Sequence, residues 1–195
     1  MIRKPRDHEA EQCASLLYQS GPEVFDYFFA SPEELVIRYL VMFFPKPDTA
    51  FSKEYILVEE HDGEIRGAVA ALPGREKQQL ERNIGRYFKE LVRLAGIIRC
   101  LRMITRGRLA RYLSVIGRDE YYIGNLAVHA ARRGNGVGPA LLAAAADAAR
   151  DAGYKKLSLL VELNNHHARH VYDAFGFHVE REVVLPPKYA RHALF

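Results

Sequence analysis

Residues 128–138 read Val128-His129-Ala130-Ala131-Arg132-Arg133-Gly134-Asn135-Gly136-Val137-Gly138. This glycine-rich run decides the fold, because of what lies on either side of it. The residues before it, 121–128, are rich in aromatic and branched side chains, which is typical of a strand. The residues after it begin with Pro139, which suits a first helical turn, and continue with Ala and Leu. The order strand, glycine loop, helix predicts an α/β protein.

The chemistry of this loop predicts a phosphorylated ligand. Three glycines in five residues allow tight bending and a close approach of the backbone to a ligand. A helix N-terminus adds unpaired N–H groups and a partial positive charge, which together favour phosphate. A glycine-rich turn that binds nothing is the alternative.

Two other phosphate-binding loops are excluded by their own requirements. The loop of nucleotide triphosphatases ends in Gly-Lys-Ser/Thr, whereas Gly138 is followed by Pro139-Ala140. A dinucleotide fingerprint has Gly-x-Gly-x-x-Gly after an early strand, whereas this loop has Gly-x-Gly-x-Gly late in the chain.

Length and composition describe a globular chain. The 195 residues, 49% of them hydrophobic, suit one domain over residues 1–195, and the mean hydropathy is −0.19. No apolar run is long enough to span a membrane. Cys13 and Cys100 are too few for a disulfide framework. We therefore expect a cytoplasmic protein with reduced thiols.

Positive charge is concentrated in one segment. The net charge is +4, but residues 75–118 hold twelve Lys or Arg and three acids, so this basic segment carries +9 and the remainder −5. Apolar residues recur within it at spacings of three and four, which predicts one long or broken amphipathic helix. A shorter helix is expected at 109–115.

The remaining periodicity predicts alternating strands and helices. Strands are expected at residues 2–4, 55–59, 65–72, 121–128, 156–163, 177–185 and 190–195. Helices are expected at residues 7–20, 31–45, 139–153 and 165–175. Asp62-Gly63 predicts a hairpin turn between the second and third strands.

A second motif lies downstream, at residues 165–177: Asn165-His166-His167-Ala168-Arg169-His170-Val171-Tyr172-Asp173-Ala174-Phe175-Gly176-Phe177. It resembles the Asn-x-x-Ala-x-x-aliphatic-Tyr-x-x-x-Gly-Phe pattern of the GNAT acetyltransferase superfamily. Arg133-x-x-Gly136-x-Gly138, after a strand ending in Leu126-Ala127-Val128, resembles that family's acetyl-CoA signature. The resemblance implies the GNAT acyl-CoA N-acyltransferase fold, with a mixed central sheet flanked by helices. The basic segment would be a helical insertion before the cofactor-binding strand.

The resemblance implies acetyl-CoA as donor substrate and a set of residues that bind it. Backbone groups of Leu126 and Val128 would bond the pantetheine and the acetyl carbonyl, and the glycine loop would hold the pyrophosphate. Arg133 would add its charge, and Asn165 would contact the pantetheine, cap a helix, or do both. The full set is Leu126, Ala127, Val128, Arg133, Gly134, Asn135, Gly136, Val137, Gly138, Pro139, Asn165, Ala168 and Tyr172.

The catalytic residues follow from the same resemblance. Tyr172 lies on a helical apolar stripe, where a tyrosine is usually part of the core, but the matching family tyrosine is near the cofactor sulfur. It would act as general acid toward the thiolate or only as a hydrogen-bond donor. No acid or His lies inside the strand at 121–128, so the base would be Glu162 or Tyr122 acting through water. Glu162 has an equally good reading as a solvated charge at a strand end.

No metal is expected. His166, His167 and His170 lack a supporting carboxylate pattern and are explained as surface residues at a helix start.

The sequence thus predicts an N-acetyltransferase that transfers an acetyl group from acetyl-CoA to an amine by direct attack in a ternary complex. The alternatives are a CoA-binding module without turnover, and a peptide or protein N-terminal or lysine acetyltransferase in place of a small-molecule enzyme. The basic segment would be a solvated helix, a wall of the acceptor pocket, a homodimer contact, or a surface for an acidic partner. Nucleic acid is the least expected partner, because no nucleic-acid motif accompanies the charge.

Overall fold

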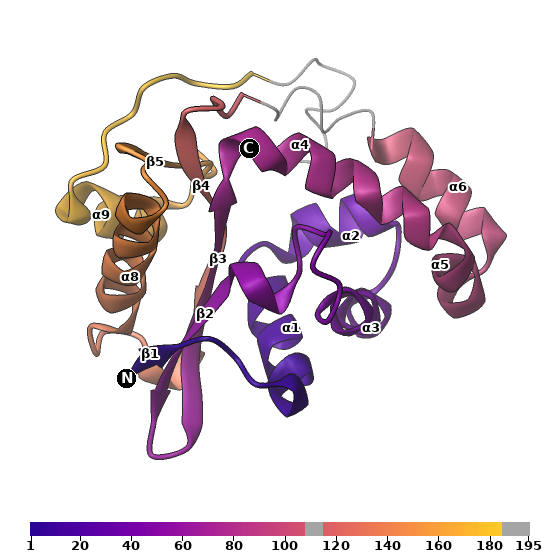
Figure 1. The fold of residues 1–195 in the computed structure, drawn as a ribbon, viewed down its shortest axis with the longest axis horizontal. Helices are drawn as coiled ribbons and strands as arrows, with labels where there is room; N and C mark the ends of the chain where they lie inside the picture. The colour runs from indigo at the N-terminus through magenta and orange to yellow at the C-terminus, as the bar shows by residue number, and fades with distance from the viewer. Residues whose placement is uncertain (108–114, 185–195) are drawn as a thin grey trace.

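The computed structural model describes residues 1–107 and 115–184. Its centre is a five-stranded mixed sheet in the order β1 (Ile2–Arg3), β2 (Ile56–His61), β3 (Glu64–Pro73), β4 (Glu120–Val128) and β5 (Lys156–Leu159). Neighbouring strands are antiparallel except β4 and β5, which run parallel. The predicted mixed sheet flanked by helices is confirmed (Figure 1).

Helices cover both faces of this sheet. Figure 1 shows α8 and α9 on one side, and α1 to α6 on the other. The α-helices are α1 (Ala10–Gln19), α2 (Pro22–Phe29), α3 (Glu33–Phe43), α4 (Gly74–Asn83), α5 (Phe88–Ala95), α6 (Ile97–Arg106), α8 (Val137–Asp151) and α9 (His166–Phe175). Short 3-10 helices are η1 (Asp7–Glu9), η2 (Lys53–Tyr55), η3 (Ile84–Tyr87) and η5 (Ala130–Arg132).

Strand β3 explains why the protein has two hydrophobic cores. Successive side chains of a strand point to opposite faces. Accordingly Ala68 and Ala70 belong to the core under α1 and α3, while Val69 and Ala71 belong to the core under α8. Because both faces of β3 are buried, its sequence is nearly all apolar rather than alternating.

The hairpin between β2 and β3 is confirmed. Asp62 and Gly63 have φ angles of 52° and 80°, so both adopt the left-handed conformation that a tight two-residue hairpin turn requires.

The basic segment is a broken helix, as its periodicity indicates. It comprises α4, η3, α5 and α6, with Gly96 at a φ of 82° between the last two. Leu91 and Cys100 are buried in the core under α1 and α3, so this segment packs on the same side of the sheet as those helices.

One helix was missed and two expectations about strands were wrong. The first helix does end before Gly21-Pro22, but Pro22 is also in the first turn of a further helix, α2 (Pro22–Phe29), which was not predicted. Strand β5 ends at Leu159 rather than at residue 163. Residues 177–184 form no strand, since they make side-chain contacts such as Lys156–Glu180 without a backbone ladder. The expected helix at 109–115, except Val115, and the strand at 190–195 lie outside the described residues.

Candidate active site

The candidate site begins where β4 and β5 separate. Their parallel pairing covers Glu120–Ile123 of β4 against β5, and among the described residues it goes no further. At that point Gly124 is an extra residue in β4, because Ala70 and Ala71 of β3 pair with Asn125 and Ile123. Such a bulge bends a strand. The edge of β4 after Gly124 therefore has no partner strand among the described residues, and we call this unpaired edge the opening between β4 and β5.

Backbone groups of Leu126 and Val128 point into this opening. The His129 N–H donates to the Arg66 carbonyl at 2.8 Å, on the β3 side of the strand. Because backbone groups alternate in direction along a strand, those of Ala127 also face β3, while those of Leu126 and Val128 face the opposite edge. These are the two residues whose backbone groups the resemblance assigns to pantetheine and the acetyl carbonyl.

An ion pair between a half-exposed lysine and a buried glutamate joins β4 and β5 where their pairing begins. The Lys156 Nζ lies 2.9 Å from a Glu120 carboxylate oxygen, and the two residues are direct partners across β4 and β5. Burial raises the pKa of Glu120, but hydrogen bonds, led by that from Lys156, outweigh it and leave the pKa below its usual value. Glu120 is thus committed to joining the strands.

The glycine loop presents a row of free backbone donors. The first helical bond of α8 runs from the Ala140 N–H to the Gly136 carbonyl, at 3.1 Å. The N–H groups of residues 134–138 donate to no described residue, since Gly136 at the N-cap has no side chain and the first-turn donors have no partner within the helix. Such a row is suited to bind a pyrophosphate.

Backbone conformation explains two of the three glycines. Gly134 and Gly136 have φ angles of 81° and 76°, in the left-handed region. Gly138 has an ordinary φ, and a Cβ there would meet only Val128 at 3.8 Å, an ordinary contact. The fold therefore tolerates a side chain at Gly138.

The two arginines before the glycines differ. Arg132 forms an ion pair with Glu64 at 2.6 Å. Arg133 is exposed, and its Nε lies 3.4 Å from the Val128 carbonyl at the open edge of β4. Its side chain is free to turn toward an anion in the loop, although its own backbone N–H is engaged with Ala130 at 3.4 Å.

Helix α9 supplies Asn165, Ala168 and Tyr172. The Asn165 side chain accepts a hydrogen bond from the Ala168 N–H at 3.1 Å and so caps the helix. Tyr172 is half-buried against the core under α8, with its ring 5.8 Å from that of Phe177. Burial raises the pKa of Tyr172, which keeps the phenol protonated, and its hydroxyl makes no hydrogen bond with any described residue.

Tyr122 interacts electrostatically with Tyr172. Burial raises the pKa of Tyr122, and the negative charges of Glu81 and of an ionised Tyr172 raise it further. The Lys77 Nζ lies 5.3 Å from the centre of the Tyr122 ring and 2.5 Å from a Glu81 carboxylate oxygen. Helix α4 of the basic segment therefore covers Tyr122. The sequence placed this segment before β4 but did not single out Lys77 or Glu81, because their i, i+4 spacing is also that of an ordinary surface pair.

Glu162 lies beyond the end of β5 and is half-buried. Burial raises its pKa, and the negative charge of Glu23 on α2 raises it further. Glu23 was not found from the sequence, because α2 itself was not. The turn between α1 and α2 is attached to β4, because the Asn125 side chain donates a hydrogen bond to the Ser20 Oγ at 2.8 Å.

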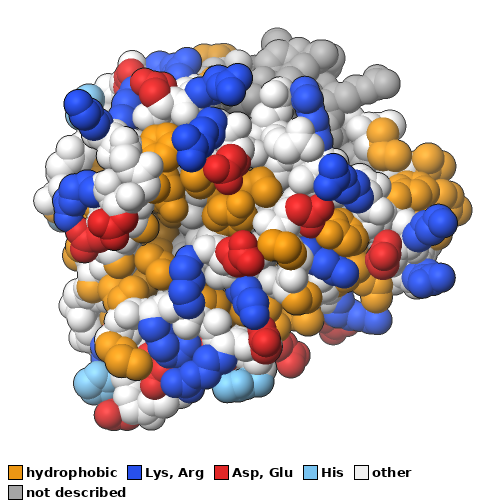
Figure 2. Space-filling view, viewed as in Figure 1, with side chains coloured by type: hydrophobic (Ala, Val, Ile, Leu, Met, Phe, Trp, Pro, Cys, Tyr) orange, Lys and Arg blue, Asp and Glu red, His pale blue; other side chains and the backbone are white. Residues whose placement is uncertain are grey.

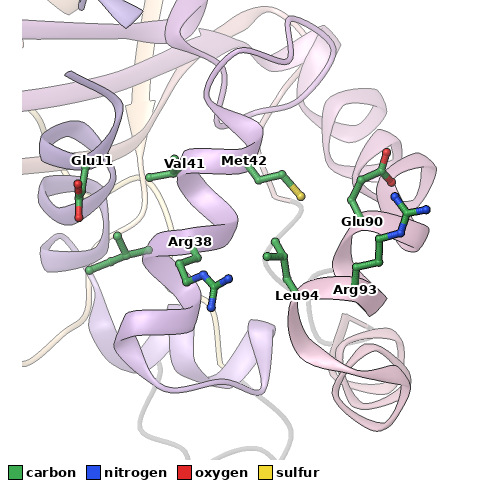
Figure 3. A pocket seen from close by; sticks show the side chains of 8 residues that line it. Glu11, Arg38, Val41, Met42, Glu90, Arg93 and Leu94 are labelled. Atoms are coloured by element: carbon green, nitrogen blue, oxygen red, sulfur yellow. The ribbon is translucent and has the colours of Figure 1, made fainter. Parts of the chain in front are cut away.

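Other candidate features lie elsewhere. No group of three or more His, Cys, Asp or Glu able to hold a metal occurs in residues 1–107 and 115–184. His166, His167 and His170 are exposed. An open groove of about 550 Å³ runs between α3 and α5, with an apolar floor that includes Val41, Met42 and Leu94 (Figure 3). It is on the other side of the sheet from α8 and is not part of this site.

The chain belongs to the GNAT family of acetyltransferases, whose family model matches residues 24–177. No curated protein matches it significantly. Solved structures resemble it at low identity. An N-acetyltransferase from Staphylococcus aureus Mu50 is 21% identical with a TM-score of 0.68, covering 95% of this chain and 94% of the other. A structure described as an acetyltransferase is 22% identical with a TM-score of 0.67, covering 91% and 89%.

A third similar structure contains coenzyme A. It is the aminoglycoside N-acetyltransferase AAC(6')-Iy in complex with CoA, 14% identical with a TM-score of 0.59, covering 95% of this chain and 92% of that one. These likenesses show the fold, which is that of GNAT acetyltransferases.

Proposed function

We propose that the protein is an N-acetyltransferase that moves an acetyl group from acetyl-CoA to an amine by direct attack in a ternary complex. The observation that carries the proposal is the row of free N–H groups at residues 134–138, next to the open edge of β4. A row of donors at a helix N-terminus fits a pyrophosphate, and an open strand edge fits the amide-rich pantetheine.

The residues present fit acetyl-CoA along its length. The loop from Arg133 to Gly138, with Pro139 behind it, would hold the pyrophosphate. Leu126 and Val128 would bond the pantetheine and the acetyl carbonyl through their backbone, with Ala127 between them. Asn165 and Ala168 would flank the pantetheine while keeping their mutual hydrogen bond. Acetyl-CoA supplies the thioester, and the chain supplies position and proton transfer.

Two proton transfers are assigned to this chain's residues. The attacking amine must lose a proton, and Glu162 accepts it through water, because the raised pKa of this carboxylate makes it a stronger base than an ordinary glutamate. Tyr172 donates a proton to the departing thiolate, because burial keeps its phenol protonated. Tyr122, which interacts electrostatically with Tyr172, is the alternative first protein group on the path of the amine proton.

The acceptor is proposed to be a cationic amine, in a small molecule or a peptide. Glu162 and Glu23 interact electrostatically, so two carboxylates contribute negative charge at this end of the candidate site, whereas Glu81 is paired with Lys77. Negative charge of this kind attracts an ammonium group. One of the similar structures is an aminoglycoside N-acetyltransferase, and a cationic acceptor is compatible with that likeness.

The donor half of the proposal is tested with a charge at Gly138. Gly138→Asp places a carboxylate among the free donors, where it favours the helix but repels a pyrophosphate. We expect affinity for acetyl-CoA, measured by calorimetry, to fall by about 100-fold or more, in line with about 3 kcal/mol for an unfavourable buried charge, while the melting temperature does not fall.

Gly138→Asn is the matched control, because it has the same shape without the charge. Equal loss of affinity in the two variants would show that volume and not pyrophosphate charge is responsible. Unchanged affinity in both would place the cofactor elsewhere.

A CoA-binding module without turnover is the second candidate. It is favoured by one observation: the buried carboxylate on β4, Glu120, is bound to Lys156 and not available as a base. An assay of acetyl transfer to a panel of amines, in which release of the CoA thiol is measured, distinguishes the enzyme from the module. Tight acetyl-CoA binding without thiol release in the presence of any amine supports the module.

We further propose that residues 1–195 act as one domain, with the basic segment as its insertion. Cys13 and Cys100 are free and buried, which agrees with a reducing compartment such as the cytoplasm.

A further inference from the structure

Helix α6 exposes a set of large apolar side chains. Ile97, Ile98, Leu101 and Ile104 are 49%, 66%, 53% and 59% exposed. The other three follow Ile97 by one, four and seven residues, and this spacing puts all four on one face of the helix. Exposed aliphatic side chains are ordinary when scattered, but a contiguous set marks an interaction surface. We call these four residues the α6 face.

The α6 face is not the side by which α6 packs on the protein. The opposite side carries Cys100, which is 1% exposed, and Met103, which packs on the core under α1 and α3. Arg106 secures the end of the helix, because its Nη1 donates to the carbonyls of Tyr27 at 2.8 Å and Asp26 at 3.3 Å. The helix is therefore held in place with the α6 face turned outward.

Positive charge accompanies this face. Helix α6 contains three arginines and no acid, and α5 adds Lys89, Arg93 and a single acid, Glu90. Arg99 and Arg102 are exposed on α6. Figure 2 shows hydrophobic and basic side chains side by side at the end of the molecule formed by α5 and α6.

We propose that the α6 face binds the surface of an anionic lipid bilayer, with α6 lying in the plane of the headgroups. Aliphatic residues enter the boundary between headgroups and acyl chains, while Arg99 and Arg102 remain at the level of the lipid phosphates. No described helix is long and apolar enough to cross a membrane, so the binding is peripheral.

Charge also argues against the two other occupants. A second copy pairing α6 with α6 would bring arginines together without an acid on either helix. A nucleic acid would satisfy the arginines, but α6 has no aromatic side chain for base stacking, and four aliphatic residues would face a polar polymer. A bilayer with anionic lipids satisfies both halves of the surface.

The position of α6 leaves the glycine loop of the candidate active site accessible. In Figure 1, α6 and α8 lie at opposite ends of the molecule, on opposite sides of the sheet. The glycine loop precedes α8, so a bilayer on α6 would not cover it. Membrane binding is thus independent of whether the protein turns over acetyl-CoA.

Vesicle binding tests the proposal on the whole chain. The chain has no Trp, so Leu101→Trp introduces a single reporter on the α6 face. With vesicles of phosphatidylcholine and phosphatidylglycerol we expect its emission to shift to the blue and the protein to sediment with the vesicles. Vesicles of phosphatidylcholine alone should bind about 30-fold less, because Arg99 and Arg102 contribute about 1 kcal/mol each near an anionic surface. The matched control is Val179→Trp, at an exposed valine 61% accessible outside α6, whose emission should not shift.

Two further variants separate the parts of the surface. Ile98→Asn with Leu101→Asn should abolish sedimentation, and Arg99→Gln with Arg102→Gln should remove the preference for anionic lipid. Circular dichroism should be unchanged in both, since the substituted side chains are exposed. Equal blue shifts for the Leu101 and Val179 reporters, or no binding to either vesicle, would overturn the proposal. So would a dimer in light scattering that the asparagine pair dissociates, or binding to a DNA duplex but not to vesicles.

Discussion

The proposed chemistry depends most directly on the phenol group of Tyr172. It is half-buried, its hydroxyl bonds to no described residue, and burial raises its pKa. A hydroxyl without a structural partner can be removed with little effect on folding, commonly within about 0.5 kcal/mol. Proton donation, as proposed above, would give this hydroxyl a role that packing does not require.

For Tyr172→Phe we expect kcat to fall by about 100-fold or more, the usual size of a general acid's contribution. Affinity for acetyl-CoA should be unchanged, because the ring remains. Stopped thiol-release assays and calorimetry measure the two quantities. Tyr121→Phe is the control, since Tyr121 is on the same strand as Tyr122 but points into the core under α8. A fully active Tyr172→Phe enzyme would reduce Tyr172 to a packing residue.

Glu162 and Glu23 give a pH dependence whose sign is fixed. Glu162 acts as a base only when deprotonated, so kcat/KM should rise with pH through its pKa, which burial and Glu23 hold above 4.5. In Glu23→Gln the neighbouring charge is gone, so the pKa falls and the rising limb moves to lower pH. Glu34→Gln, an exposed change on α3, should not move it. If Glu162→Gln keeps the rising limb, another group is the base.

At the scale of elements, the basic segment is more than a solvated helix. Helix α4 covers Tyr122 through Lys77, and α6 holds the end of α2 through Arg106. Since α2 carries Glu23, the segment fixes the element that brings a carboxylate to the candidate site. These contacts support the interpretation of the segment as a wall of the acceptor pocket.

Arg106→Gln tests this link between α6 and α2. Loss of charge-assisted bonds to two carbonyls, and of the contact with the Tyr27 ring at 5.1 Å, should reduce the free energy of unfolding by about 1–2 kcal/mol. We expect KM for the amine to rise, while affinity for acetyl-CoA is unchanged. Arg102→Gln, an exposed change one turn earlier, should alter neither. A parallel loss of acetyl-CoA affinity would mean general loosening of the fold.

How far the elements could be predicted depends on what decides each one. The glycine loop, β4 and α8 follow from local rules of turns and caps. Residues 177–184 alternate like a strand, but a strand also needs a partner edge, and no local pattern reveals whether β5 offers one. Helix α2 was missed because Gly21-Pro22 fits both the end of one helix and the start of the next.

The same distinction holds for the candidate site. Residues in a motif were placed by resemblance, and they lie on β4, in the glycine loop and on α9. Glu23, Lys77 and Glu81 belong to no motif. They are positioned by the packing of α2 on α1, α3 and α6 and of α4 on β3 and β4, which are long-range contacts that the residue types do not encode.

At the scale of the whole molecule, ion pairs between side chains connect the edge of the sheet to the segment that precedes α1. Arg3 on β1 bonds the Glu9 carboxylate at 2.5 Å and the Glu60 carboxylate on β2 at 2.5 Å. The Arg6 backbone N–H donates to Glu9 at 2.6 Å. The hydrogen bond from Arg3 lowers the pKa of Glu9 to about 2, against the effect of burial. Glu9 is 6% exposed, so the join is largely shielded from water.

This join makes stability depend on pH in a known direction. A carboxylate whose pKa is lower in the folded state stabilises the fold above its unfolded value of 4.5, and the contribution is lost as pH falls toward 2. Glu9→Gln should therefore reduce the free energy of unfolding by about 2 kcal/mol at pH 7, discounted for partial solvent screening. Between pH 4.5 and 2 the difference between wild type and variant should shrink toward zero. Urea unfolding at several pH values measures it, with Glu11→Gln, an exposed change two residues away, as the control. A difference that stays constant with pH would mean that Glu9 acts by packing and not by its charge, and the ionic join would then not be what ties β1 and β2 to α1.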